Sequence, residues 1–116
     1  MQVKTIKEKI SFEELKKIAL EGYGEMVKAV VDVETGIMAV GGELHADESE
    51  ALFEQGSKNE NLWGINIYLN RLKEDCLEYN SLINVKPSVN RSMDILSLEI
   101  KEKIMKIVSN LIEWKI

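Results

Sequence analysis

Apolar and polar residues alternate along two central stretches of the chain, residues 26–33 and 62–69. Both stretches are rich in β-branched or aromatic side chains, and alternation with a period of two is typical of a strand with one buried face. Residues 37–40 form a third apolar stretch, and Gly36 just before it suits the left-handed position of a three-residue hairpin loop. The pattern therefore predicts a hairpin followed by a separate central strand.

Two more strands are expected, at residues 2–7 and at residues 76–86. The second stretch alternates over its whole length, and Pro87 follows it directly. Proline has no N–H group to donate to a neighbouring strand, so we expect the strand to end there.

Apolar residues that recur every three or four positions predict three helices. Ser11 opens the first helix in a capping-box pattern, and Gly22 ends it. The second is a short helix over residues 48–55, with Asp47 as its candidate N-cap. Ser97 can cap the last helix. This helix carries a broad apolar stripe made of Ile100, Ile104, Ile107, Val108, Leu111, Ile112 and Trp114.

The predicted order of elements is β-α-β-β-α-β-β-α. Hairpin connections favour an α+β fold with a mainly antiparallel sheet of about five strands, and with three helices on one face of it. A chain of 116 residues is expected to form one domain, residues 1–116.

The composition is 45% hydrophobic and 30% charged, which is ordinary for a globular protein. The net charge of −5 argues against nucleic acid as a partner, because the chain lacks an overall basic field. No apolar run approaches the roughly 20 residues that span a bilayer, and residues 1–20 lack the apolar segment of a signal peptide. Cys76 stands alone and cannot form an internal disulfide. We therefore expect a cytoplasmic protein without membrane contact.

Candidate chemistry is concentrated in the segment Gly41-Gly42-Glu43-Leu44-His45-Ala46-Asp47, which contains the single histidine of the chain. In an extended backbone, Glu43, His45 and Asp47 would project to the same side, as an acid/base pair or a divalent metal requires. A typical structural zinc site needs more His or Cys ligands. Asp47 also fits the N-cap of the next helix. The sequence thus predicts no metal or other cofactor, and leaves His45, Glu43 and Asp47 as candidate catalytic residues.

Gly41 and Gly42 precede a helix, and free amides at a helix N-terminus attract anions. The phosphate-binding patterns GxGxxG and GxxxxGK[ST] are absent from the sequence, and Glu43 and Asp47 would repel an anion. A strand exit or a bulge is the more ordinary use of such glycines.

A second polar group lies on the predicted strands at residues 62–69 and 76–86. Asparagine is depleted in strands, so its recurrence here indicates either a ligand-binding face or a network of buried amides. The two interpretations have equal weight. The candidate ligand-binding residues on this face are Asn66, Tyr68, Asn84 and Lys86.

Lys86 and Arg91 flank a short loop that contains Ser88 and Asn90. A basic residue at each end, with a hydroxyl and an amide between them, suits a phosphate or a carboxylate. The same composition is typical of a solvated loop, and Asp94 could pair with Arg91. A small anionic ligand is the partner that this loop predicts.

The segments 41–47, 62–68, 81–88 and 90–92 together resemble a small prokaryotic family known only as a domain of unknown function. The family pattern has proline and arginine where this chain has Leu69 and Lys86. Lysine lacks the planar two-donor fork of arginine, which weakens the case for bidentate anion binding at that point. The resemblance extends over nearly the whole chain. It implies a cytoplasmic single-domain protein and no particular activity.

Three functions agree with these features. The leading hypothesis is binding of a small ligand or a partner at a polar site around His45, where the loops after residues 40 and 86 meet at one end of the sheet. A hydrolase of a phosphodiester or related ester would use His45 as acid or base, oriented by Glu43 or Asp47, with Lys86 and Arg91 as oxyanion stabilisers. A structural role would use the C-terminal helix as a homodimer interface.

Overall fold

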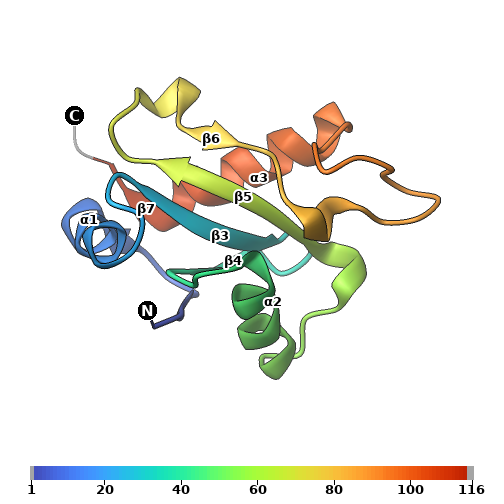
Figure 1. The fold of residues 1–116 in the computed structure, drawn as a ribbon, viewed down its shortest axis with the longest axis horizontal. Helices are drawn as coiled ribbons and strands as arrows, with labels where there is room; N and C mark the ends of the chain where they lie inside the picture. Colours follow the sequence, from blue (N-terminus) through green and yellow to red (C-terminus); the bar gives the residue numbers. More distant parts are fainter. Residues whose placement is uncertain (1, 115–116) are drawn as a thin grey trace.

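The central element is an antiparallel sheet with the strand order β1-β4-β3-β5-β6 (Figure 1). The computed structural model describes residues 2–114. β3 lies in the middle and pairs with β5 over all seven of its residues. The predicted α+β class and mainly antiparallel sheet are therefore confirmed. The strands of this sheet are β1 Lys4–Ile6, β3 Met26–Asp32, β4 Ile37–Val40, β5 Leu62–Tyr68 and β6 Leu77–Glu78.

The three predicted helices are present, and two of them begin as the caps predicted. Ser11 Oγ accepts a hydrogen bond from the backbone N–H of Glu14 at 3.1 Å, and Ser97 Oγ accepts one from Ile100 at 3.2 Å. Within the described residues, no helix combines the length and apolar content needed to cross a membrane. The helices are α1 Phe12–Glu21, α2 His45–Glu54 and α3 Leu98–Leu111, with single 3₁₀ turns at η1 Asn59–Asn61, η2 Lys73–Asp75 and η3 Leu82–Asn84.

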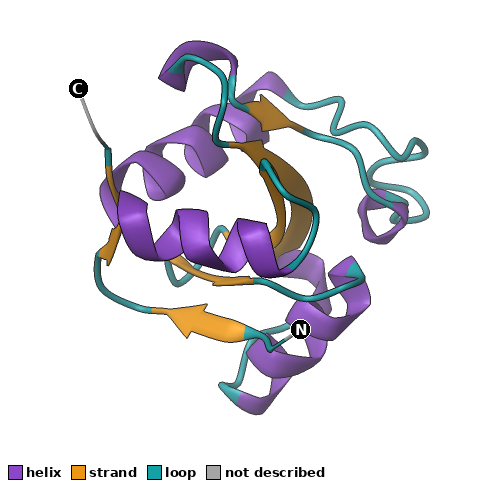
Figure 2. Ribbon diagram, turned by 60° about the vertical axis from the view of Figure 1, so that its left-hand side comes forward, coloured by secondary structure: helices purple, strands orange, loops and turns teal. Residues whose placement is uncertain are grey.

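Helices cover both faces of the sheet, so the prediction that they lie on one face is wrong (Figure 2). On one face, Val31 of β3 belongs to a core that includes Leu15 of α1 and Ile104 of α3. On the other face, Val30 packs in a smaller core with Leu52 of α2. Since β3 carries apolar side chains on both of its faces, each face requires a covering layer.

The apolar stripe of α3 packs within the molecule. Ile104, Val108 and Leu111 are buried in the larger core. The ring of Trp114 lies 6.2 Å, centroid to centroid, from that of Phe12 at the start of α1. The stripe that suggested a homodimer is thus covered by the chain itself, and dimerisation stays an untested prediction.

A small parallel pair of strands, β2 Ile10–Ser11 and β7 Ile112–Glu113, joins the two ends of the described chain. Each strand has two residues. A pattern with a period of two cannot be recognised in so short a segment, so this pair was not predictable from alternation.

The predicted strand over residues 76–86 is wrong for most of its length. Only Leu77–Glu78 pair with β5, and the chain then follows an irregular path through η3 to the start of α3. The edge of β5 beyond β6 is instead paired with the side-chain amide of Asn84. Alternation along the sequence does not distinguish such an edge from a longer strand.

Candidate functional site

The predicted site segment follows β4 and turns sharply into α2. Gly41 has a φ of +92°, a left-handed conformation that favours glycine. α2 begins at His45, three residues earlier than predicted, and Asp47 lies in its first turn. Asp47 Oδ2 accepts a hydrogen bond from the backbone N–H of Leu44 at 3.0 Å, so the carboxylate caps the helix by reaching back. The prediction that Asp47 is the N-cap residue is therefore wrong.

This early helix start changes the relation between the three candidate catalytic residues. The extended backbone that would place Glu43, His45 and Asp47 on one side is absent, because the last two lie within α2. Glu43 is exposed, and its backbone carbonyl accepts a hydrogen bond from the hydroxyl of Tyr23. Glu43, His45 and Asp47 therefore do not project to the same side as they would from an extended strand.

His45 is buried, with 8% of its surface exposed, and its ring is held by the backbone of β5. Nε2 lies 2.8 Å from the carbonyl oxygen of Ile65. A carbonyl oxygen can only accept, so Nε2 carries the proton and Nδ1 of a neutral ring is an acceptor. Burial lowers the pKa of His45, and nearby Lys28 lowers it too, while the Ile65 carbonyl and the neighbouring Asn66 side chain oppose the shift. His45 is therefore neutral at pH 7.

A groove of about 320 Å³ opens beside His45, between the first turn of α2, strands β3 and β5, and the irregular segment after β6. Its lining combines a polar floor with apolar walls. The polar residues are Lys28, His45, Asn66, Asn80 and Ser81, and the apolar ones are Leu44, Ala46, Leu82, Ile83 and Met93.

Three residues form a polar row across the sheet, and two of them, Lys28 and Asn66, line this groove while Glu78 lies beside it. Lys28, Asn66 and Glu78 are direct neighbours on β3, β5 and β6. Asn66 Nδ2 donates to Glu78 Oε1 at 2.8 Å, whereas the buried Asn66 Oδ1 has no hydrogen-bond partner among the described residues. The Lys28 ammonium lies 5.3 Å from the ring centroid of Tyr23, and within the described part of the chain it forms no ion pair. The row therefore contains a cation and an acceptor that the fold leaves free.

Asn84 and Asn90, which were predicted to bind a ligand, hold the backbone of the irregular segment. Asn84 is fully buried, and its amide accepts from the N–H of Gly64 at 2.8 Å and donates to the carbonyl of Gly64 at 3.0 Å. The amide therefore pairs with β5 as a neighbouring strand would. Asn90 Nδ2 donates to the carbonyl of Asn84, and Asn90 Oδ1 accepts from the N–H of Leu96. The alternative interpretation, a network of buried amides, describes these two residues.

Lys86 is also engaged within the protein. Its ammonium donates to the carbonyl of Asn59 at 2.8 Å and lies 4.9 Å from the ring centroid of Trp63. Burial lowers the pKa of Lys86. Ser88, with a φ of +70°, is at the exposed tip of a tight turn that Lys86 and Asn90 close through backbone hydrogen bonds.

Arg91 and Tyr68 lie outside the groove lining. Arg91 is exposed and has no hydrogen bond or ion pair within residues 2–114, and Asp94 accepts from Asn80 instead. The Arg71 guanidinium stacks over the ring of Tyr68 at 3.8 Å. Of the residues predicted to form a site, the groove thus brings together His45 and Asn66.

Sequence reasoning missed Glu48, which is completely buried beneath the Gly41-Gly42 turn. A Cβ atom placed on Gly42 would lie 2.7 Å from Glu48 Oε2, so a larger residue there would require the Glu48 side chain to move. Among residues 2–114, neither carboxyl oxygen has a well-formed hydrogen bond. Burial raises the pKa of Glu48 to about 8, and the backbone N–H groups of Glu48 and Gly42 offset only part of this shift. A glutamate in the first turn of a helix is normally solvent-exposed, so the pattern gave no signal of this.

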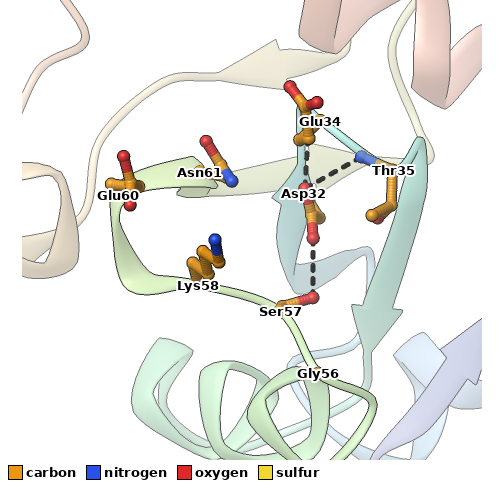
Figure 3. A pocket seen from close by; sticks show the side chains of 8 residues that line it. All are labelled: Asp32, Glu34, Thr35, Gly56, Ser57, Lys58, Glu60 and Asn61. Atoms are coloured by element: carbon orange, nitrogen blue, oxygen red, sulfur yellow. Dashed lines mark hydrogen bonds between the residues drawn. The ribbon is translucent and has the colours of Figure 1, made fainter.

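Asp32, a second unpredicted residue, lines a polar depression formed by the β3–β4 turn and the loop after α2 (Figure 3). Asp32 Oδ1 accepts from the N–H groups of Glu34 and Thr35, and Oδ2 accepts from Ser57 Oγ at 2.6 Å. Burial acts to raise the pKa of Asp32, but these hydrogen bonds together hold it below its ordinary value. Both oxygens are occupied, so Asp32 fastens the loop to the hairpin.

No group of three or more His, Cys, Asp or Glu side chains converges as metal ligands within residues 2–114. The candidate site is therefore defined by the groove and its polar row.

The model of a protein family described as "Protein of unknown function (DUF5674)" matches residues 4–111. The chain belongs to this family. The match confirms the resemblance to a family without an assigned function. It includes every residue of the groove and of the polar row in this DUF5674 protein. Searches of curated proteins and of solved structures found no significant match.

Proposed function

We propose that this DUF5674 protein binds a small anionic ligand in the groove beside His45. The observation that supports it most is the pairing of two unused groups in one groove. Lys28 supplies a cation without an ion pair among the described residues, and Asn66 supplies a buried acceptor without a partner.

Each unused group has a cost that a ligand would remove. A buried polar atom left without a hydrogen bond costs about 1–3 kcal/mol, and native structures contain few such atoms. His45 and Ala46 line the groove from the first turn of α2, where backbone N–H groups have no partner within the helix, whereas the N–H of the N-cap residue Leu44 donates to Asp47. Such a turn attracts anions, and Lys28 reinforces it.

The chemistry of His45 favours binding over the alternative of hydrolysis. A neutral imidazole with Nε2 held by a carbonyl presents Nδ1 as an acceptor, which suits either role. Of the two carboxylates predicted to orient the ring, Asp47 caps α2 and Glu43 is exposed, and the orienting group is the carbonyl of Ile65. The predicted oxyanion stabiliser Lys86 donates to Asn59 instead. Hydrolase activity stays a prediction without support from this arrangement.

A titration followed by ¹⁵N–¹H correlation spectra tests the binding proposal. Sodium acetate and sodium phosphate are added to millimolar concentrations at pH 7, with sodium chloride at equal ionic strength as the reference. We expect saturable shifts in the amides of residues 44–46, 66 and 80–83. Lys28→Gln should weaken acetate binding at least fivefold, because it removes the cation.

The matched control is Lys16→Gln, which removes a lysine from the exposed surface of α1. It should leave the titration unchanged. Shifts that are absent, that are equal in sodium chloride, or that fall equally in both variants would contradict the proposal.

A further inference from the structure

We infer that the ligand class of this groove is an α-amino acid with an apolar side chain, bound with its carboxylate toward Lys28 and its ammonium toward Asn66 and Glu78. This inference rests on the carboxylate binding proposed above and adds to the ligand an ammonium group, which makes it a zwitterion. It derives from the order of charges along the polar row and from the apolar walls beside it.

The polar row is an electric dipole fixed by strand register. Lys28 lies at one end, the neutral amide of Asn66 in the middle, and Glu78 at the other end. A simple anion would meet attraction at one end and repulsion at the other. A zwitterion in the opposite orientation finds a favourable partner at both ends.

The dimensions of the row agree with this ligand class. Two strand spacings separate Lys28 from Glu78, roughly 10 Å between their Cα atoms. An α-amino acid with a charge-assisted contact of about 2.8 Å at each end spans a similar distance, and the flexible side chains of Lys28 and Glu78, which extend from one face of the sheet, can adjust to it. A longer diamine or dicarboxylate would place like charges together at one end.

The middle of the row supplies acceptors. Only 7% of the surface of Asn66 is exposed, and its Oδ1 atom has no hydrogen-bond partner in the part of the chain that the structure describes. His45 Nδ1 is an acceptor because Nε2 bonds the carbonyl of Ile65. An ammonium group has three N–H donors, one for each of three acceptors: Asn66 Oδ1, His45 Nδ1 and the free oxygen of Glu78.

The walls of the groove favour an apolar side chain. Leu44 is 60% exposed, Leu82 is 73% exposed and Met93 is 44% exposed, and all three line the groove. A branched or linear hydrocarbon placed between them would remove this apolar surface from water. A small polar amino acid such as glycine would leave it exposed.

The test uses five probes that differ by one group at a time. L-Leucine has the carboxylate, the ammonium and the apolar chain. 4-Methylpentanoate lacks the ammonium, L-leucinamide lacks the carboxylate, and glycine lacks the apolar chain. N-Acetyl-L-leucine, which resembles the C-terminal end of a peptide, replaces the ammonium by a neutral N–H donor. Titration calorimetry and ¹⁵N–¹H spectra should show L-leucine binding at least fivefold more tightly than each of the others.

Two variants separate the ends of the row. Lys28→Gln should weaken binding of L-leucine and 4-methylpentanoate, but not of L-leucinamide. Glu78→Gln should weaken binding of L-leucine and L-leucinamide, but not of 4-methylpentanoate. A variant that merely disturbed the fold would weaken all probes alike. Glu74→Gln, at an exposed position of η2, is the matched control for Glu78→Gln and should change none of them.

The outcomes distinguish this inference from the proposed function. If acetate shifts the groove amides but L-leucine binds no better than 4-methylpentanoate, the amino acid inference is overturned and anion binding stands. If N-acetyl-L-leucine binds best, the ligand is the end of a peptide and the inference is also overturned. If neither acetate nor L-leucine shifts these amides, both proposals fail.

Discussion

At the scale of single residues, the Glu48 carboxyl group and the Gly42 backbone occupy one tightly filled space. Glu48 has no exposed surface, and a Cβ atom on Gly42 would lie only 2.7 Å from its Oε2 atom, which is closer than van der Waals contact. In the folded protein Glu48 therefore stays protonated to a higher pH than usual, with a pKa of about 8 against 4.5 for the ordinary group. This difference makes stability depend on pH.

Glu48→Gln is expected to stabilise the protein in alkaline solution. The folded state binds the Glu48 proton more tightly than the unfolded state, so the free energy of unfolding falls as pH rises from about 4.5 to about 8. Glutamine is neutral and nearly the same size, so the variant should lose this part of the slope. From the difference between the two pKa values, the gain above pH 8 should be on the order of 5 kcal/mol.

Urea unfolding of both proteins between pH 5 and pH 9 measures the effect, because the free energy of unfolding falls linearly with urea concentration. Comparison with wild type isolates Glu48 from other titrating groups such as His45. Glu50→Gln, an exposed position on α2, is the matched control. A stability difference that did not change with pH would show that Glu48 is ionised in the folded state.

At the scale of elements, β5 has two kinds of neighbour on its outer edge. β6 pairs with Asn66 and Ile67, and the Asn84 amide pairs with Gly64. A Cβ atom on Gly64 would lie 2.6 Å from Ser81, so the close approach of the irregular segment needs glycine there. This substitute for a strand also forms one wall of the groove, because Ser81 and Leu82 belong to the same segment.

Asn84→Ala is expected to destabilise the protein by about 2–4 kcal/mol, since it leaves several buried backbone groups unpaired. These are the N–H and carbonyl of Gly64 and the carbonyl of Met93. Urea unfolding measures the loss, and hydrogen exchange should show the Gly64 amide losing protection.

Asn80→Ala is the control, because the amide of Asn80 bonds Asp94 in an exposed pair. Its effect should stay below about 1 kcal/mol. Equal losses in the two variants would mean that Asn84 does not serve as a strand substitute.

At the scale of the whole molecule, the two ends of the described chain are joined in the larger core. Ile10 and Ile112 are register partners in the parallel pair β2–β7, and both are buried. α1 follows β2 directly and α3 precedes β7 directly, so this pair fixes the layer of helices on one face of the sheet. The groove lies on the opposite face, with α2.

Ile112→Ala should cost about 2–5 kcal/mol, because it creates a cavity where the two ends meet. Unfolding should remain a single transition when it is followed by both tryptophan fluorescence and circular dichroism. Leu98→Ala, at a 70% exposed position of α3, should change stability little. A second transition in the Ile112 variant would mean that the ends unfold separately from the sheet.

The sequence by itself determined the class of fold and most element boundaries. Residues 26–40 specify a hairpin through alternation and a glycine suited to φ > 0, and Gly36 does adopt a φ of +77°. Ser11 and Ser97 specify two helix starts through their capping hydroxyls. These signals are local, because each depends on groups within a few residues of one another.

Only the tertiary structure decided the composition of the site. Asn66 and Asn84 look alike in the sequence. The amide of Asn84 is hydrogen-bonded to the backbone of Gly64, whereas the Oδ1 atom of Asn66 has no hydrogen-bond partner among the described residues. Glu48 resembles an ordinary helix residue until Gly42 closes over it. Hydrogen-bond satisfaction and burial depend on residues distant in the chain, so no local pattern encodes them.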